Sequence, residues 1–374
     1  MVGTLKRFTK RIFVLATILL AAVYTATCLI PYLNPAKYWV IGVLGLGFPI
    51  TTLIMVVLLI VWLILRSRWA WLPLVMLIIG YQQISAFFAT SLPAEFKKEK
   101  KGNTLRILDW NVSHWDEYNK NRKNGQTYRD KMMELIKAQN ADILCFQEFF
   151  ESHSPHDFKS NIPELQAMGF EHYYFAEESS RYYGAFQVGI AIFSKYPIVD
   201  SSRFKFTAGS AAESVISADI QVGDTIIRVH TTHLQSVRFD QKDYQGLHRI
   251  KNTEDSALEA SKTIFTKLKK AYQYRNVQAK EVRSRINASP YPVIVCGDFN
   301  DTPNSYTYFT IRGNLRDAFI DAGSGIGRTF RYLSPTLRID YILADKYFRA
   351  AQYVRYKVPY SDHYPIVADL EFPH

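Results

Sequence analysis

The chain has 374 residues, of which 48% are hydrophobic and 14% aromatic, so it can build a sizeable core in one large domain or two. Its formal net charge is +11, but seven of the 45 basic residues and only one of the 34 acidic residues precede residue 97. The remainder of the chain is therefore only mildly basic, with too little positive charge for a protein that must neutralise many phosphates of a duplex.

Residues 1–96 are predicted to form a membrane region. Three apolar runs without a charged residue cover 12–30, 39–65 and 69–92, and a helix that crosses the hydrocarbon core needs about 20 residues. Prolines interrupt the chain between the first two runs, and an Arg-Ser-Arg turn separates the second from the third. We therefore expect three transmembrane helices. A cleaved signal peptide is the alternative for the first run, but no clear cleavage site follows it.

The distribution of basic residues predicts the orientation of these helices. Positive charge gathers before the first run and after the second, at Lys6, Arg7, Lys10, Arg11, Arg66 and Arg68. Because cytoplasmic loops carry the excess of Lys and Arg, the amino terminus is expected in the cytoplasm. Three crossings then place the rest of the chain outside it, which in a bacterium means the outer side of the inner membrane. Four lysines just after the third run, at 97, 98, 100 and 101, argue the other way.

A charged linker, 97–104, precedes a soluble domain that is predicted to cover 105–374. The domain opens with an apolar strand that ends at Asn111, and a polar loop with Gly125 follows it. Apolar residues at helical spacing predict a helix over 127–140, and the next apolar strand ends at Glu148. Strand, helix and strand at this spacing indicate an α/β architecture.

Further apolar segments predict a mixed sheet structure downstream. Strands are expected at 170–175, 188–193, 203–206, 214–220 and 225–233, the last two joined by a Val-Gly-Asp hairpin turn. A long helix is expected over 245–286, where acids dilute the many Lys and Arg residues. A solvated helix face is therefore favoured there over a phosphate-binding patch. Two cysteines, Cys145 and Cys296, fall inside predicted strands and are expected to be structural thiols.

Polar side chains stand at the ends of several predicted strands. The clearest case is Val293–Pro303, where four apolar residues and a glycine precede Asp298, Asn300 and Asp301. Such a segment alone is as well explained by an Asx-rich turn, and each histidine alone by a structural role. However, the same pattern, an apolar strand with a polar side chain at its end, recurs along the chain. It yields one set of candidate site residues: Asn111, Glu148, His233, Asp298, Asn300, Asp340, Asp362 and His363.

These residue types are suited to hydrolysis at phosphorus. Glu148 and Asn111 offer the hard oxygen ligands that Mg²⁺ prefers, and no Cys/His pattern with zinc spacing occurs in the sequence. Asp298 can accept a proton from an attacking water, and Asn300 can hold that water or donate to phosphate. His233 and His363 can donate to phosphate oxygens, with Asp340 keeping one of them protonated.

The motifs together resemble the endonuclease/exonuclease/phosphatase superfamily. They are WN at 110–111, QE at 147–148, THL at 232–234, GDFND at 297–301, RIDYIL at 338–343 and SDH at 361–363. The resemblance implies a four-layer α/β/β/α sandwich of two mixed sheets and hydrolysis of a phosphoester that depends on Mg²⁺ or Mn²⁺.

The resemblance also implies a role for each matched residue. Glu148 would be the main metal ligand with Asn111 close by, and Asp298 would orient or deprotonate the water. Asn300 and His233 would contact the phosphate. Asp340 would pair with His363, and Asp362 would lie beside the metal.

One departure bears on the substrate. Ser113 stands two residues after Asn111, where the DNA-repair members carry an acid, whereas THL and RIDYIL look more like the sphingomyelinase-like branch. We therefore expect a phosphoester substrate, with a phospholipid head group favoured over nucleic acid, and contact with the lipid bilayer. An extracytoplasmic nuclease is the main alternative, and a tethered scaffold without turnover is less favoured because the motif residues are complete. No protein partner can be inferred.

Overall fold

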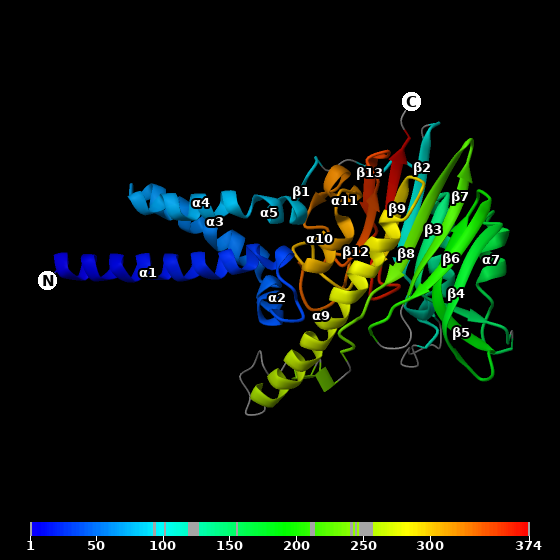
Figure 1. Ribbon diagram of the computed structural model, residues 1–374, viewed down its shortest axis with the longest axis horizontal. Helices are drawn as coiled ribbons and strands as arrows, with labels where there is room; N and C mark the ends of the chain where they lie inside the picture. The colour runs from blue at the N-terminus through cyan, green and yellow to red at the C-terminus, as the bar shows by residue number, and fades with distance from the viewer. Residues whose placement is uncertain are drawn as a thin grey trace. The chain divides into compact units, whose positions relative to one another are not determined.

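The computed structural model describes residues 2–92, 95–100, 102–118, 127–154, 156–209, 214–239, 242–243, 245–246 and 257–372. The chain forms two compact units. The first comprises 1–88, 238–276 and 303–309, and the second comprises 89–237, 277–302 and 310–374. Figure 1 shows the elements of both units.

The first unit begins with helices built from the apolar runs of the sequence. These are α1 (Val2–Cys28), α2 (Trp39–Gly45), α3 (Phe48–Ile64), α4 (Trp71–Ile79) and α5 (Tyr81–Phe87), with short 3-10 turns at Ile30–Tyr32 and Arg68–Ala70. Among the described residues, one helix, Arg7–Tyr32, is long and apolar enough by itself to cross a membrane.

The second and third apolar runs differ from the expected uninterrupted spans, because each is a pair of helices bent at a break. The bend is 62° between α2 and α3, and 60° between 68–79 and α5. Glycines lie at both breaks: Gly45 and Gly47 at the first, followed by Pro49 in the first turn of α3, and Gly80 at the second. Counting each bent pair as one span gives up to three crossings.

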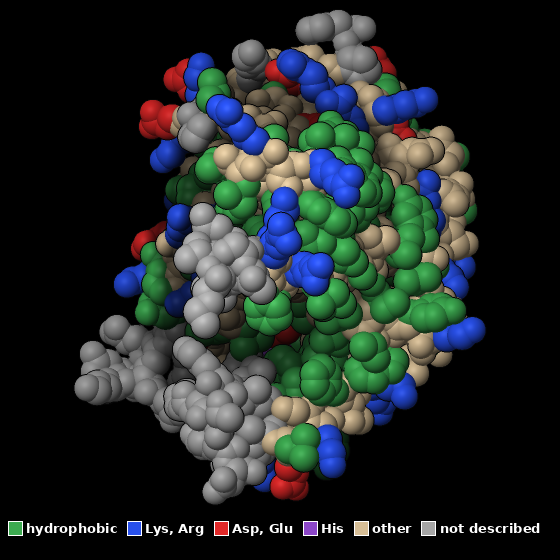
Figure 2. Space-filling model, turned by 90° about the vertical axis from the view of Figure 1, so that its left-hand side faces the viewer, with side chains coloured by type: hydrophobic (Ala, Val, Ile, Leu, Met, Phe, Trp, Pro, Cys, Tyr) green, Lys and Arg blue, Asp and Glu red, His purple; other side chains and the backbone are tan. Residues whose placement is uncertain are grey.

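Polar contacts tie these helices together, while apolar side chains cover their outside. The Trp62 indole N–H donates to the Thr17 hydroxyl at 3.2 Å, and Gln83 Nε2 donates to the Cys28 carbonyl at 2.7 Å. Apolar side chains predominate on the face shown in Figure 2. The exposed large hydrophobic residues of this unit include Leu19, Ile50, Leu53, Leu63, Ile64 and Ile78. An apolar surface of this kind is typical of contact with lipid or protein rather than water.

The second unit contains two six-stranded sheets. The order in the first sheet is β10 (Arg316–Asp317), β12 (Asp340–Ala344), β9 (Val293–Asp298), β8 (Thr225–His233), β7 (Ser214–Val222) and β6 (Ile198–Lys205). The order in the second is β13 (Arg349–Arg355), β14 (Ile366–Glu371), β2 (Thr104–Asn111), β3 (Ile143–Ser152), β5 (Phe186–Ser194) and β4 (His172–Arg181). One pair in each sheet is parallel, β8 with β9 and β2 with β3, so both sheets are mixed as predicted. A small pair, β1 (Ala89–Thr90) with β11 (Ser324–Gly325), stands apart.

The main core lies between the two sheets. Ile107 and Cys145 from the second sheet share a buried cluster with Ile294 and Cys296 from the first. Side chains alternate along each strand, so Leu108 and Phe146 point to the other face and join a second cluster with helices α6 (Arg129–Gln139) and α7 (Ile162–Ala167). Both strand cysteines are buried and free.

Three other α-helices and a 3-10 turn at Ser113–Asp116 are described. The helices are α9 (Ala257–Asn287), α10 (Tyr306–Arg312) and α11 (Ala318–Ala322). Within the second unit, Gln278 of α9 accepts a hydrogen bond from the Gln235 N–H just after β8, at 2.9 Å. The part of α9 from 277 onward therefore lies next to the first sheet, as the outer helical layer of a sandwich would.

The predicted elements agree with the structure where a segment has a strong apolar period. The helix expected over 127–140 is α6, and the strands expected at 188–193, 214–220 and 225–233 are β5, β7 and β8. The strand expected at 170–175 instead starts at His172 and runs to Arg181, and the one at 203–206 is the end of β6. The long helix is described from Ala257, while 247–256 and loop residues 119–126 with Gly125 lie outside the described residues.

Candidate active site

The register of the first sheet places three predicted site residues side by side. Asp298 ends β9, where it pairs with His233 at the end of the parallel neighbour β8. On its other side Asp298 pairs with Asp340, which begins the antiparallel strand β12. Strands β8 and β9 thus end, and β12 begins, at the same edge of the first sheet. Their polar side chains meet at this edge, and all three lie within the second unit.

The second sheet contributes Asn111 and Glu148 to the same place. Asn111 ends β2, and Glu148 lies on β3 at a register shift between Phe146 and Phe149, with φ at 50°. This bulge turns the glutamate side chain out of the regular alternation. Asn111 Nδ2 lies 3.3 Å from Glu148 Oε1 and 3.2 Å from Asp298 Oδ2, so one carboxamide bridges carboxylates from both sheets.

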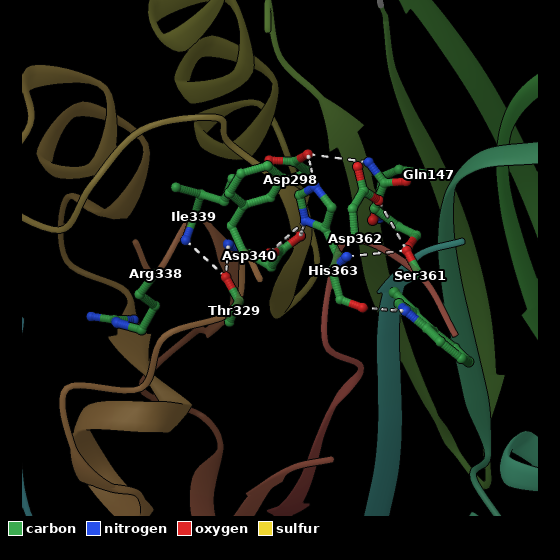
Figure 3. Close-up of polar contacts among 12 residues, drawn as sticks. Gln147, Asp298, Thr329, Arg338, Ile339, Asp340, Ser361, Asp362 and His363 are labelled. Atoms are coloured by element: carbon green, nitrogen blue, oxygen red, sulfur yellow. Dashed lines mark hydrogen bonds and ion pairs between the residues drawn. The ribbon is translucent and has the colours of Figure 1, made fainter. Parts of the chain in front are cut away.

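Two histidine side chains lie close to the Asp298 carboxylate. His363 Nε2 and His233 Nε2 each lie 3.6 Å from Asp298 Oδ2, and His233 Nε2 lies 4.0 Å from Glu148 Oε1. His363 Nδ1 in turn lies 3.0 Å from both oxygens of Asp340. Figure 3 shows Asp298, Asp340 and His363 pointing toward one another. The predicted pairing of Asp340 with His363 is present in this arrangement.

Backbone and hydroxyl groups fix the orientation of this histidine pair. The Thr329 hydroxyl accepts hydrogen bonds from the backbone N–H groups of Ile339 (2.9 Å) and Asp340 (3.1 Å). Ser361 Oγ accepts one from the His363 N–H at 3.1 Å and donates to the Asn111 carbonyl at 2.8 Å (Figure 3). These bonds hold the imidazole in a fixed position between Asp340 and Asp298.

Burial and neighbouring charges set the protonation states of the titratable side chains in the site. Burial raises the pKa of Asp298 to about 6, against the opposing effect of His363. Although burial lowers it, Asp340 and Asp298 raise the pKa of His363 well above its ordinary value. Burial also acts to raise the pKa of Glu148, but three histidines, His114 foremost, bring it below its ordinary value. At neutral pH, His363 is therefore a cation and Glu148 an anion, while the pKa of Asp298, about 6, lies close to neutral pH.

A group of three residues and, separately, Glu148 offer ligand atoms to a cation in the site. Asp298, Asp340 and His363 have such atoms within 4.8 Å of one another, but both oxygens of Asp340 are already close to the His363 ring. Glu148 is ionised, and its side chain is 29% exposed, whereas that of Asp298 is 1% exposed. An accessible carboxylate fits a divalent cation that keeps several of its waters, so Glu148 is the better site.

The remaining predicted site residues have local partners. Asn300 adopts a left-handed conformation, its N–H donates to Asp298 Oδ1 at 2.8 Å, and its Nδ2 donates to the Leu234 carbonyl at 3.0 Å. Asp362 Oδ1 lies 3.1 Å from Ser361 Oγ. The predicted contacts of Asn300 with phosphate and of Asp362 with the metal stay predictions.

Asn111 is oriented by a turn of its own. Its Oδ1 accepts a hydrogen bond from the Ser113 N–H at 3.0 Å, which directs Nδ2 toward Glu148 and Asp298. In this orientation the carboxamide donates to the carboxylates. It would have to rotate to place its oxygen on a cation.

Two residues of the site were not singled out from the sequence. His114 Nδ1 lies 3.3 Å from Glu148 Oε2. Gln147 Nε2 donates to Asp109 Oδ1 at 2.8 Å and across to Thr231 Oγ1 of the first sheet at 2.9 Å, beneath the site. Gln147 was part of a recognised motif. His114 stands in a polar segment three residues after Asn111, and that proximity was the one available signal.

Comparisons with known proteins identify a family for the larger part of the chain. A family model described as the Endonuclease/Exonuclease/phosphatase family matches residues 110–363, and a model for a domain of unknown function (DUF8431) matches residues 10–87. No curated protein sequence matches the chain.

Solved structures share the fold at low sequence identity. An endonuclease/exonuclease/phosphatase from Beutenbergia cavernae has a TM-score of 0.53 and 19% identity over 72% of each chain. The human nocturnin catalytic domain with a bound sulfate anion has a TM-score of 0.50 and 19% identity, covering 72% of this chain and 95% of that one. At this identity the likeness establishes the fold alone.

Proposed function

The chain belongs to the endonuclease/exonuclease/phosphatase family, and from that premise we propose that it is a membrane-anchored phosphoester hydrolase that depends on a divalent metal. The observation that supports this most is the convergence on Asp298 Oδ2 of Asn111 Nδ2 at 3.2 Å and of two histidine nitrogens at 3.6 Å. The carboxylate can serve as a base for an attacking water, and the carboxamide and the two histidines can donate to phosphate oxygens.

Glu148 is proposed as the principal ligand of Mg²⁺ or Mn²⁺, with Asn111 and Asp362 as neighbours in the site. The bound cation would supply charge stabilisation to the phosphoryl oxygens. The lowered pKa of Glu148 keeps this carboxylate ionised and available for that role. Asn111, held by Ser113, keeps Glu148 and Asp298 in a fixed relation.

The other side chains are assigned to the water and the phosphate. Asp298 accepts the proton of the attacking water, which a carboxylate with a pKa of about 6 does well near neutral pH. His363, held as a cation by Asp340, donates to a phosphate oxygen, and His233, whose Nε2 lies at the same 3.6 Å from Asp298 Oδ2, does the same. Asn300 is proposed to help position the phosphate.

We propose a phospholipid head group or another small phosphodiester as the substrate. The second unit follows a region with an apolar exterior, and a membrane anchor raises the local concentration of a lipid substrate without a basic groove. Tyr182 and Tyr183 are exposed in the turn between β4 and β5. This turn lies next to the carboxyl-terminal end of β3, the strand that carries Glu148. Exposed tyrosines are suited to contact with a lipid interface.

The substrate class predicts the outcome of a direct assay. The full-length chain, purified in detergent, is offered sphingomyelin, phosphoinositides, plasmid DNA and RNA with Mg²⁺ or Mn²⁺, and a chelator serves as the control. We expect lipid head groups to be cleaved faster than plasmid, with only a mild dependence on salt. Plasmid nicking that collapses between low and moderate salt, without lipid turnover, would favour the extracytoplasmic nuclease. Turnover of none of these substrates would favour the scaffold.

The proposed location is a bacterial inner membrane, with the amino terminus in the cytoplasm and residues 105–374, the proposed catalytic domain, outside it. The bias of Lys and Arg around the first two apolar runs supports this orientation. Alkaline phosphatase fused to the carboxyl terminus is therefore expected to be active in cells. An inactive phosphatase together with an active cytoplasmic reporter at the same position would reverse the topology.

A further inference from the structure

The segment after Asn111 has an unusual backbone. Four consecutive residues, Ser113 to Asp116, have positive φ angles of 44°, 58°, 56° and 62°. None of them is glycine, and L-residues disfavour this left-handed region, especially in succession. A run of this kind persists only where the surrounding structure holds it, and such runs gather at functional sites.

The side chain of Trp115 holds this turn. It is fully buried and packs edge-on against Phe146 and Phe149. The backbone N–H of Trp115 donates to the Val112 carbonyl at 2.8 Å, and the side chain of the next residue, Asp116, accepts a hydrogen bond from the Tyr128 N–H at 3.0 Å. Anchoring Trp115 in the core leaves the preceding side chain, His114, directed to the site.

His114 meets Glu148 at the open part of the site. The distance from Nδ1 to Glu148 Oε2 is 3.3 Å, and the side chains are 31% and 29% exposed. The other oxygen of Glu148 lies 3.3 Å from Asn111 Nδ2. Two donor atoms that share one octahedral cation at about 2.1 Å lie about 3 Å apart, so His114 and Glu148 already have nearly the separation of neighbouring ligands.

We propose that His114 is a nitrogen ligand of the cation held by Glu148, and that it shifts the preference of the site from Mg²⁺ toward Mn²⁺. This inference rests on the proposed function. Mg²⁺ prefers oxygen ligands and gains little from an imidazole, whereas transition-metal ions bind nitrogen more strongly than Mg²⁺ does. The turn at Ser113 to Asp116 is then the device that adds a nitrogen to an otherwise oxygen-based site.

The test compares the affinities of Mn²⁺ and Mg²⁺ by calorimetry on the full-length chain in detergent. His114→Asn keeps a residue that tolerates positive φ but replaces the nitrogen by an amide oxygen. We expect this variant to lose at least about 10-fold in Mn²⁺ affinity while Mg²⁺ affinity changes about twofold or less. Nitrogen coupling in the electron spin echo of bound Mn²⁺ should weaken in the same variant.

Two further variants separate metal binding from folding. His114→Gly removes the ligand but relieves the left-handed backbone, so it should lose Mn²⁺ affinity while its unfolding temperature stays equal or rises. His172→Asn, on β4, is the matched control and should bind both ions as the unchanged chain does.

The outcomes distinguish this inference from the proposed function. Unchanged Mn²⁺ affinity and nitrogen coupling in His114→Asn and His114→Gly would overturn the role of His114 and leave metal-dependent hydrolysis standing. Equal losses for both ions would overturn the shift in preference. Absence of any divalent-cation binding by the unchanged chain would overturn the proposed function as well.

Discussion

Glu148→Gln is expected to lower turnover at least about 1000-fold and to abolish measurable Mg²⁺ binding, while the chain stays folded. The amide has the shape of the carboxylate but lacks the charge that holds a divalent cation. Fold stability should change little, because the Glu148 side chain is partly exposed and lies at a bulge rather than in the core. Turnover, calorimetric Mg²⁺ affinity and unfolding temperature measure the three parts of this prediction.

The matched control for this variant is Glu177→Gln on β4. That carboxylate is exposed on the edge strand β4, which β5 separates from β3, and it accepts a hydrogen bond from Gln187 Nε2 at 2.8 Å. It should leave turnover and Mg²⁺ affinity unchanged. If Glu148→Gln bound Mg²⁺ as tightly as the unchanged chain, Glu148 could not be the principal ligand.

Asp298→Asn is expected to lower turnover by about 100- to 10,000-fold, the range that a positioned general base contributes. The substitution keeps the acceptor for the Asn300 N–H but removes the group that takes the proton. Asp200→Asn, an exposed carboxylate on β6, is the control and should be fully active. Activity near that of the unchanged chain would assign the base to another residue.

The pH dependence of turnover is a second test of the role of Asp298 as the base. The pKa of Asp298 is raised to about 6, so the carboxylate loses its charge as the pH falls through that value. Turnover should therefore fall about tenfold per pH unit below pH 6 and level off above it. In Asp298→Asn this acidic limb should disappear from the residual rate. A limb that persists unchanged would show that another group titrates.

The contribution of Asp298 to the stability of the fold should have the opposite pH dependence, falling as the pH rises. Burial raises the folded-state pKa of Asp298 above its unfolded value, so the protonated form stabilises the fold. That contribution is complete below the unfolded pKa of about 4 and is lost as the pH rises through about 6. At pH 8 the asparagine variant should thus unfold at a temperature no lower than the unchanged chain, which scanning calorimetry can check.

The sequence by itself determined the strands of the second unit and the residue types at their ends. An apolar run such as 293–296 must be buried whatever surrounds it, and the polar residues that follow mark where it ends. The family resemblance that the motifs carry implied two mixed sheets, and the polar residues at the strand ends predicted one site that includes Asp298, Asp340 and His363. Residue composition also predicted the apolar helices of the first unit.

The tertiary structure decided how these pieces meet. Hydropathy predicts apolar runs but not their bends, so the breaks at Gly47 and Gly80 are seen only in the structure, where the Tyr24 side chain of α1 lies against Gly80. The bulge at Glu148 and the left-handed turn that presents His114 are backbone conformations unfavourable in isolation. They are held by packing between segments far apart in sequence, such as Trp115 on Phe146 and Phe149, which local sequence does not encode.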